Sequence, residues 1–296
     1  MRLFVTGGAG HTGCNFLRLF LSDNDKNNAV VLVKPTTDRS YLPEAADNRI
    51  EIVEGDIRTE SISQFMSGCD ALMHIAHQTL CPAIVDQALK SGVRRVFFVT
   101  TTGVFSKFND LSNEYKQIEN QIRQSNLDWT ILRPTMIFGS ERDANLHKLL
   151  RYLNSYSVFP VFGDGNGLMQ PVYVGDLAEG LLLATKNGDA TVRKEYNLSG
   201  EAPLTYNNLV KVAAKELNRN VRLVHVPYAV SLALSMAAET VLGKRSPIVS
   251  EQVRRLKENK AFSWSEARSD FGYSPGTFVD RIHLEVERLR AVGLIA

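Results

Sequence analysis

Short apolar runs alternate with amphipathic stretches through the first half of the chain. The apolar runs lack the polar alternation of a half-exposed sheet, so helices are expected to cover both faces of each strand. They occupy residues 3–6, 30–33, 50–53, 71–74, 96–100 and 130–132. Helical periodicity lies between them, at residues 12–22, 60–66, 82–91 and 112–125. This order predicts an α/β fold with a doubly wound parallel sheet, which binds ligands at the carboxyl ends of its strands.

The pattern changes after about residue 139, where helical periodicity dominates. Helices are predicted at residues 144–155, 176–186, 206–217, 228–242, 250–257 and 278–290. Short strands are predicted at residues 159–162, 171–174, 195–198 and 222–225. We therefore expect a sheet domain over residues 1–139, with strands returning to it from later segments, and a smaller C-terminal α+β region over residues 140–296. The chain has no Gly/Ser-rich linker at this boundary, so we interpret it as a change of fold within one folding unit.

A glycine-rich turn follows the first strand directly and precedes the first predicted helix. Glycines let the backbone turn sharply and approach a ligand closely, and the helix start offers free N–H groups and a positive dipole end to a diphosphate. Because a strand precedes the turn and a helix follows it, we predict a Rossmann-type dinucleotide site. The alternative is a glycine-rich turn that binds nothing. The residues expected to contact the cofactor here are Gly7, Gly10, His11, Thr12 and Gly13.

Charge at the end of the second strand favours NADP(H) over NAD(H). An NAD site usually has an acidic residue at this position, which binds the ribose hydroxyls. This chain has Lys34 instead, with Arg39 nearby. A cation attracts a 2′-phosphate, and the missing carboxylate removes a repulsion. The alternative is that Lys34 and Arg39 are solvated surface charges.

Composition and charge exclude several other classes of protein. The chain has 296 residues, is 44% hydrophobic and carries a formal net charge of +2, so nothing favours nucleic acid or an anionic membrane as a partner. The three cysteines are far apart and lack metal-ligand spacing, so neither a metal site nor a disulfide framework is indicated. The most apolar helix, at residues 230–242, contains Glu239 and is too short to span a bilayer. The N-terminal residues are already a strand, so we expect no signal peptide and a cytoplasmic location.

Further short motifs follow the glycine-rich turn along nearly the whole chain. They are Glu54-Gly-Asp-Ile57, Met73-His-Ile-Ala-His77, Phe98-Val-Thr-Thr-Thr102, Leu132-Arg-Pro134, Phe138-Gly139, Pro171-Val-Tyr-Val-Gly-Asp176, Tyr196-Asn-Leu-Ser-Gly200 and Phe271-Gly-Tyr-Ser-Pro275. In this order they resemble the extended and atypical short-chain dehydrogenase/reductases, above all nucleoside-diphosphate-sugar epimerases and dihydroflavonol-reductase-like enzymes. The resemblance implies an NAD(P)-dependent oxidoreductase or epimerase, acting on a small carbonyl or nucleotide-sugar substrate that the C-terminal region binds.

The resemblance also implies roles for residues at matching positions. Asp56 and Ile57 would flank the adenine, and Ala76, with His77 beside it, would line the ribose.

Two further segments match the nicotinamide end of the site. Pro134 and Thr135 would lie beside the nicotinamide. Thr101 or Thr102 occupies the place where the family keeps a hydroxyl that binds the substrate oxygen.

The predicted helix at residues 112–125 departs from the family pattern. Relatives carry a tyrosine and, four residues later, a lysine, so that both share one helix face and the lysine lowers the tyrosine pKa. Here Tyr115 and Lys116 are adjacent and point about 100° apart. Four residues after Tyr115 comes Glu119, whose negative charge would raise the pKa of the phenol. A shift of register by one residue does not restore the pair.

Three interpretations follow from an intact nucleotide motif beside an altered catalytic pair. The first is an enzyme that uses another acid, with Tyr115, Lys116, His77 or Thr102 as candidates. The second is an NADP(H)-binding sensor that acts through a protein partner, and the third is a ligand-binding remnant without turnover. In relatives the helices matching residues 82–91 and 112–125 often form a homodimer, which we expect here as well. Three further cations could meet a substrate diphosphate or simply form a solvated helix face: Arg142, Lys148 and Arg151.

Overall fold

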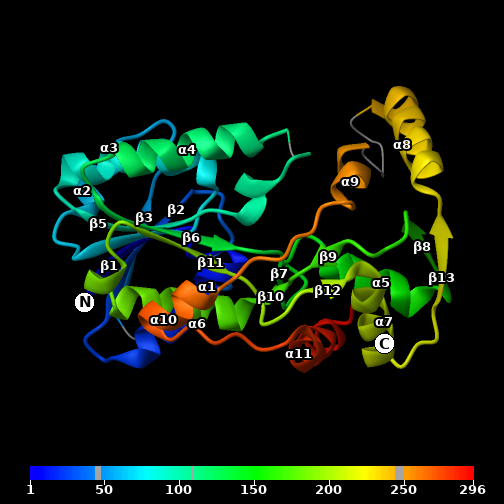
Figure 1. Cartoon of the computed structure of the whole chain (residues 1–296). Coiled ribbons are helices and arrows are strands. Elements are labelled where there is room, and N and C mark those ends of the chain that lie inside the picture. Colours follow the sequence, from blue (N-terminus) through cyan, green and yellow to red (C-terminus); the bar gives the residue numbers. More distant parts are fainter. Residues whose placement is uncertain (44–47, 109, 244–249) are drawn as a thin grey trace.

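The structure is a computed structural model that describes residues 1–43, 48–108, 110–243 and 250–296. Its first lobe is built on a seven-stranded sheet in the order β11-β6-β5-β4-β1-β2-β3, with every neighbouring pair parallel (Figure 1). This sheet confirms the predicted fold class. The strands are β1 (Arg2–Thr6), β2 (Asn28–Val33), β3 (Ile50–Glu54), β4 (Ala71–His74), β5 (Arg95–Val99), β6 (Asp128–Pro134) and β11 (Lys194–Leu198).

Helices cover both faces of this sheet (Figure 1), because its inner strands are apolar on both sides. Along β1, Leu3 and Val5 join one core cluster and Phe4 joins the other, since successive side chains of a strand point to opposite faces. One face carries α2 (Ser63–Met66), η2 (Gln78–Leu80), α3 (Cys81–Ser91), η3 (Thr102–Phe105) and α4 (Ser112–Gln124). The other carries α1 (His11–Asp23), α6 (Val174–Lys186), η4 (Asp189–Thr191) and α10 (Ser265–Phe271).

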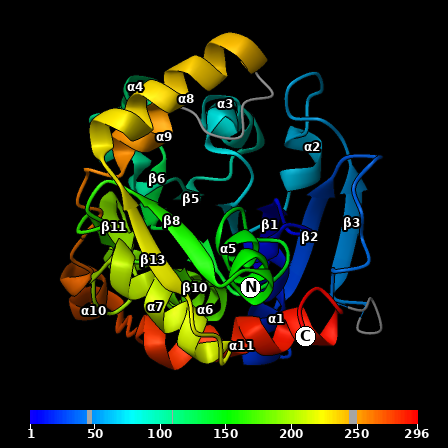
Figure 2. The same ribbon diagram turned by 90° about the vertical axis from the view of Figure 1, so that its right-hand side faces the viewer.

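The second lobe is smaller and mixes helices with two-stranded sheets. Its core contains Phe138, Leu150, Leu209 and Val286. Figure 2 shows its outer face, with α8 at one end. The helices are α5 (Leu146–Ser155), α7 (Tyr206–Glu216), α8 (Tyr228–Leu242), α9 (Ser250–Arg255) and α11 (Phe278–Ala291). The paired strands are β7 (Ile137–Phe138) with β10 (Val172–Tyr173), β9 (Leu168–Met169) with β12 (Leu204–Thr205), and β8 (Val158–Phe162) with β13 (Arg222–Val226).

Most predicted elements occur within a few residues of their expected positions. The helix predicted at residues 60–66 is a single turn, Ser63–Met66, and the strand predicted at 130–132 extends over Asp128–Pro134. The pattern missed α10, which is too short for helical periodicity to stand out. Elements β11 and α6 come late in the chain, yet both belong to the first lobe.

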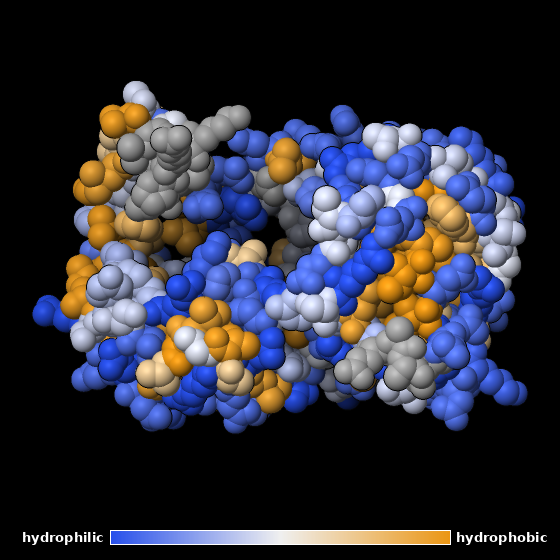
Figure 3. All heavy atoms as spheres, turned by 180° about the vertical axis from the view of Figure 1, so that it is seen from behind, coloured by the Kyte–Doolittle hydropathy of each residue, from blue (hydrophilic) through white to orange (hydrophobic). Residues whose placement is uncertain are grey.

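Helix α8 exposes apolar side chains and buries small polar ones. Val230, Leu234 and Met236 are 47%, 58% and 50% exposed, whereas Ser231 and Ser235 are buried. Figure 3 shows apolar residues along the outer edge of this end of the molecule. Within the part of the chain that the structure describes, no helix is long and apolar enough to cross a membrane.

Candidate cofactor and substrate site

The glycine-rich turn joins β1 to α1 at the carboxyl edge of the sheet. Gly7 has a φ of +74°, and a Cβ on it would lie 2.6 Å from the backbone nitrogen of Ala76. A Cβ on Gly13 would lie 2.1 Å from the carbonyl oxygen of Gly7. Gly10 precedes the first residue of α1 and has no side chain to cap the helix. The turn therefore packs tightly and presents the start of α1 to any anion placed over it.

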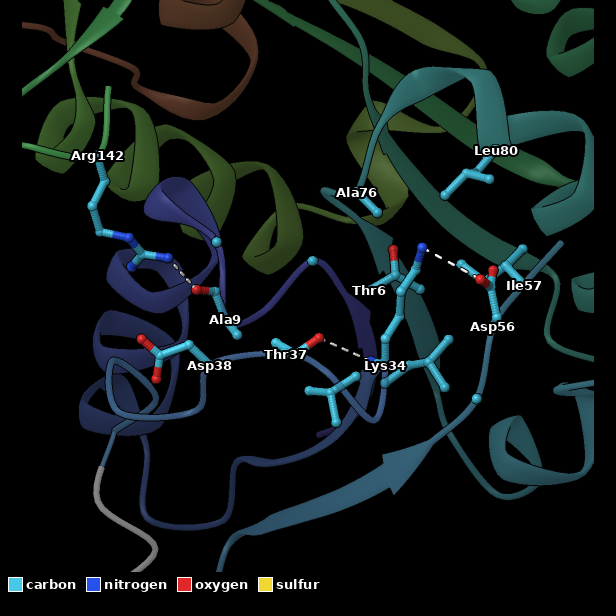
Figure 4. A pocket seen from close by; sticks show the side chains of 15 residues that line it. Thr6, Ala9, Lys34, Thr37, Asp38, Asp56, Ile57, Ala76, Leu80 and Arg142 are labelled. Atoms are coloured by element: carbon cyan, nitrogen blue, oxygen red, sulfur yellow. Dashed lines mark hydrogen bonds and ion pairs between the residues drawn. The ribbon is translucent and has the colours of Figure 1, made fainter. Parts of the chain in front are cut away.

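A cavity of about 360 Å³ lies between this turn, the end of β2 and the loop after β3 (Figure 4). Apolar side chains such as Leu32 and Leu80 form part of its wall. The cavity brings together six of the residues predicted to bind the cofactor. These are Gly7, Gly10, Lys34, Asp56, Ile57 and Ala76.

A second cavity of about 470 Å³ lies on the other side of the turn. It shares Gly7, Gly10, Ala76 and Arg142 with the first cavity, so the two are halves of one site around the turn. Four more predicted cofactor residues line it, namely His11, Thr12, Gly13 and Thr135.

The two predicted phosphate cations lie in different surroundings. Lys34 lines the first cavity with its Nζ 3.3 Å from Oδ2 of Asp56, as Figure 4 shows. The backbone N–H of Arg58 and the ammonium of Lys34 hold the pKa of Asp56 below its ordinary value. Arg39 instead forms an ion pair with Glu54 at the end of β3. Only Lys34 of this pair is therefore brought to the cavity.

The threonines after β5 lie at the same edge of the sheet. The Thr101 hydroxyl accepts a hydrogen bond from the Gly103 N–H at 3.0 Å and caps η3. The Thr102 hydroxyl donates to the carbonyl of Pro134, the last residue of β6, at 3.2 Å. Thr135 then donates from its hydroxyl to the carbonyl of Gln170 in the second lobe. The ends of β5 and β6 thus bring Thr102, Pro134 and Thr135 close together.

The predicted proton carriers Tyr115, Lys116 and His77 are not among the residues that line the two cavities. Tyr115 is buried in the core between the sheet and α3, and Lys116 is exposed to solvent on the next position of α4. His77 is also exposed, with Nδ1 2.9 Å from the Thr79 hydroxyl, and it caps η2. Glu119 is buried and accepts two hydrogen bonds from the Arg133 guanidinium, at 2.8 and 2.7 Å. Its charge is therefore neutralised within a buried ion pair.

Two family models match the chain. One, described as NAD(P)H-binding, matches residues 7–149, and the other, the NAD dependent epimerase/dehydratase family, matches residues 114–199. The chain belongs to the extended short-chain dehydrogenase/reductase family. The resemblance drawn from the sequence motifs is thereby confirmed, together with an NAD(P)-binding fold.

Individual relatives of this short-chain dehydrogenase/reductase are distant. It is 25% identical over 210 residues to N-acetyl-alpha-D-glucosaminyl-diphospho-ditrans,octacis-undecaprenol 4-epimerase of Escherichia coli O157:H7, covering 64% of this chain and 63% of that protein. It is 28% identical over 142 residues to the mitochondrial NADH dehydrogenase (ubiquinone) 1 alpha subcomplex subunit 9 of Arabidopsis thaliana, covering 48% and 35%. The chain thus spans less than two thirds of the length of either protein.

A solved structure shares the fold over almost the full length. It is the dTDP-glucose 4,6-dehydratase DesIV of Streptomyces venezuelae, with NAD and TYD bound. The TM-score is 0.76, the sequence identity is 21%, and the match covers 98% of this chain and 97% of that chain.

Arg142 brings a cation of the second lobe to the candidate cofactor site. Its guanidinium donates to the carbonyl of Ala9 in the glycine-rich turn and lies 3.9 Å from the centre of the Tyr41 ring. It lines both halves of the site, whereas Lys148 and Arg151 are exposed on α5. Of the three cations considered from sequence, the structure thus brings Arg142 to the place where a diphosphate would lie.

A pair of buried carboxyl groups supports the loop that carries Arg142. Glu285 on α11 accepts a hydrogen bond from the Gly139 N–H at 2.9 Å. Burial and the nearby Asp143 raise the pKa of Glu285 to about 10, so this side chain keeps its proton at neutral pH. Burial also lowers the pKa of His11 to about 4, so that imidazole is neutral. The sequence showed no motif for this pair, because Asp143 and Glu285 lie far apart along the chain.

Proposed function

We propose that this protein is an NADP(H)-dependent oxidoreductase or epimerase that acts on a small carbonyl or nucleotide-sugar substrate. The observation that carries the proposal is the two-part site around the glycine-rich turn, where residues predicted for the cofactor line two adjoining cavities. The DesIV structure, which contains NAD, and the E. coli relative, a sugar 4-epimerase by name, support this class of reaction.

The chain's own residues have distinct roles in this proposal. The bound nicotinamide would supply or accept hydride. Backbone N–H groups at the start of α1 would hold the diphosphate, with the Arg142 guanidinium beside them. Ile57 and Leu80 would provide an apolar contact for the adenine. Pro134 and Thr135 would lie beside the nicotinamide, and Thr102 would orient the substrate oxygen.

The preference for NADP(H) rests on Lys34. Its ammonium lines the first cavity at the end of β2, where NAD-specific relatives carry an acid. Asp38 and Asp56 line the same cavity, and Asp56 already pairs with Lys34. A 2′-phosphate must therefore compete with Asp56 for the ammonium, so we expect a preference of about tenfold, equivalent to about 1.4 kcal/mol.

Titration with NADPH and with NADH, followed by reduced-nicotinamide fluorescence, tests the proposal. We expect dissociation constants in the micromolar range, with NADPH binding more tightly. Tighter binding of NADH would overturn the NADP(H) preference and keep the oxidoreductase. If neither nucleotide binds, the glycine-rich turn is structural and the whole proposal is wrong.

A second candidate function is an NADP(H) sensor that acts through a protein partner. The buried Tyr115 and exposed Lys116 favour it, because the family's catalytic pair is then missing from the site. The Arabidopsis relative is by name a subunit of a larger complex, which supports a role through protein partners. Tight NADPH binding without consumption of cofactor, across a panel of carbonyl compounds and nucleotide sugars, would favour the sensor. Turnover of any of them would exclude it.

The homodimer and the cytoplasmic location stay predictions. For the homodimer, Leu89 on α3 is 46% exposed and could pack against a second copy. Sedimentation velocity with only monomer at all concentrations would contradict it.

A further inference from the structure

A third cavity, of about 610 Å³, lies between the two lobes. One wall is the loop after β5, and the other is the segment that connects α9 to α10 and passes between the lobes in Figure 1. Thr102 lines it, so the cavity adjoins the ends of β5 and β6. Three aromatic side chains add apolar surface, Phe105, Phe108 and Phe262, and the rings of Phe105 and Phe262 are 5.6 Å apart.

The charged groups around this cavity are mostly positive. Among the described residues that line it, four cations face one carboxylate: Lys107, Arg255, Lys257 and Lys260 against Glu258. The Glu258 carboxylate accepts hydrogen bonds from the backbone N–H groups of Lys107 and Phe108, at 2.6 and 3.0 Å, and from the Ser106 hydroxyl. Arg255 lies 3.9 Å from this carboxylate and 3.5 Å from that of Glu251, so the excess of positive charge around the cavity comes from the three lysines.

Lys260 is the most enclosed of these cations. Its backbone N–H donates to the carbonyl of Leu168 at 2.8 Å, which anchors it to the second lobe. Its Nζ lies 3.9 Å from the sulfur of Met169, a weak acceptor that leaves an ammonium poorly solvated.

The surroundings of Lys260 favour the neutral amine. Burial and the positive charge of Arg255 lower its pKa to about 8, while Glu258 acts in the opposite direction. Lys107 and Lys257, which also line the cavity, add positive charge. An amine in this state can give and take a proton near neutral pH.

We propose that this cavity binds a carbonyl compound with an aromatic body and a negatively charged group, and that Lys260 meets its carbonyl oxygen. The inference rests on the proposed function, because Thr102 serves both. Lys260 would then be the proton carrier, in place of Tyr115 and Lys116. During reduction the Lys260 ammonium would give one proton to the oxygen, and the carbonyl carbon would take the hydride that a bound reduced nicotinamide supplies. The products are an alcohol, the oxidised nicotinamide and a neutral amine, which takes a proton back from water.

Pyridoxal 5′-phosphate is a suitable probe, because it joins an aromatic ring, a phosphate and an aldehyde. The neutral amine attacks the aldehyde carbon, water leaves and an imine forms, which borohydride reduces to a stable secondary amine. Peptide mass spectrometry then locates the modified lysine. At about pH 8, close to the pKa of Lys260, we expect Lys260 to react at least roughly tenfold faster than Lys148, an exposed lysine on α5. The reaction should saturate with probe concentration.

Three controls make the test decisive. Pyridoxal lacks the phosphate and has less free aldehyde, because it closes to an internal hemiacetal. Relative to Lys148, it should therefore label Lys260 about tenfold more slowly than the phosphate does if the cavity attracts anions. The Lys260→Arg variant should lose the fast label, and the Lys148→Met variant should keep it. Equal labelling by pyridoxal and its phosphate overturns the anionic substrate. A fast label on Lys107 or Lys257 instead, or a label spread evenly over exposed lysines, overturns the role of Lys260.

Titration of the same preparation with NADPH separates this inference from the proposed function. Normal NADPH binding with an unreactive Lys260 overturns the inference alone. If NADPH does not bind to this preparation, the proposed function is wrong, whatever the labelling shows.

Discussion

The candidate cofactor site and the cavity between the lobes are built in different ways. The cofactor site centres on the backbone of one turn, Gly7 to Gly13, with a few side chains added from neighbouring strand ends. The other cavity is made by side chains of two segments, which Ser106 and Glu258 join across 152 positions of the chain. Backbone N–H groups suit a diphosphate that every NAD(P) carries, whereas side chains can differ between substrates. Substitutions that damage one site should therefore leave the other intact.

The largest effect is expected from Gly13→Ala. The new Cβ would lie 2.1 Å from the Gly7 carbonyl oxygen, so either the turn or α1 must move. We expect NADPH affinity to fall by more than about a hundredfold, while labelling of Lys260 changes by less than about twofold. Gly188→Ala, whose Cβ would lie 3.3 Å from the nearest atom, serves as the control. If Gly13→Ala binds NADPH normally, the backbone of the turn does not hold the cofactor.

Glu258→Ala should damage the cavity between the lobes and spare the cofactor site. It removes the acceptor for two backbone N–H groups and one hydroxyl in the loop at residues 106–108. We expect a loss of about 2 kcal/mol in the free energy of unfolding and faster tryptic cleavage after Lys107, with unchanged NADPH affinity. Glu251→Ala on α9 should cost less than about 0.5 kcal/mol. Equal stability of the two variants would show that Glu258 does not join the walls.

Glu285→Gln tests how the second lobe supports the cofactor site. Folding raises the pKa of Glu285 from 4.5 to about 10, so the folded protein must hold a proton that the unfolded chain releases. The stability that Glu285 contributes is complete below pH 4.5 and falls as the pH rises toward 10. A glutamine can still accept from Gly139, so we expect the variant to be more stable than wild type by about 2 kcal/mol at neutral pH and equal to it in acid. Chemical denaturation at both pH values, with the exposed Glu287→Gln as control, measures this; equal stability throughout would contradict a protonated Glu285.

The smallest effect is expected from Lys34→Ala, which separates the two nicotinamide cofactors. Loss of the ammonium removes the cation that faces the 2′-phosphate and leaves Asp56 paired with Arg58 alone. We expect NADPH affinity to fall about tenfold and NADH affinity to change by less than about twofold. Lys26→Ala, an exposed lysine before β2, should change neither. A similar loss for both cofactors would mean that Lys34 does not read the 2′-phosphate.

Several residues predicted for the cofactor line one cavity because they follow the ends of successive strands. Once Gly7, Lys34, Asp56 and Ala76 are assigned to strand ends of one parallel sheet, their meeting at one edge follows from topology. Arg39 shows the limit of this reasoning. It is close to Lys34 in sequence, but its side chain pairs with Glu54.

The cavity between the lobes could not be predicted in the same way. Lys260 and Phe262 lie in an irregular segment without periodicity or motif, and their position depends on the tertiary path between α9 and α10. The pairing of Glu119 with Arg133 was missed for a related reason. The sequence placed it one helical turn from Tyr115, whereas its partner Arg133 comes from the neighbouring strand β6.

The place of β11 in the sheet has a consequence for how the protein is made. β11 pairs with β6 along its whole length, and Leu177 and Leu181 of α6 share a core with Phe16 of α1. A nascent chain that has passed β6 therefore still exposes one edge of its sheet and the apolar side of α1. At roughly 5–20 residues per second, synthesis of the segment up to β11 takes several seconds. Throughout that interval the sheet of the first lobe is incomplete on the ribosome. We therefore expect chaperones to bind the nascent chain mainly during this interval.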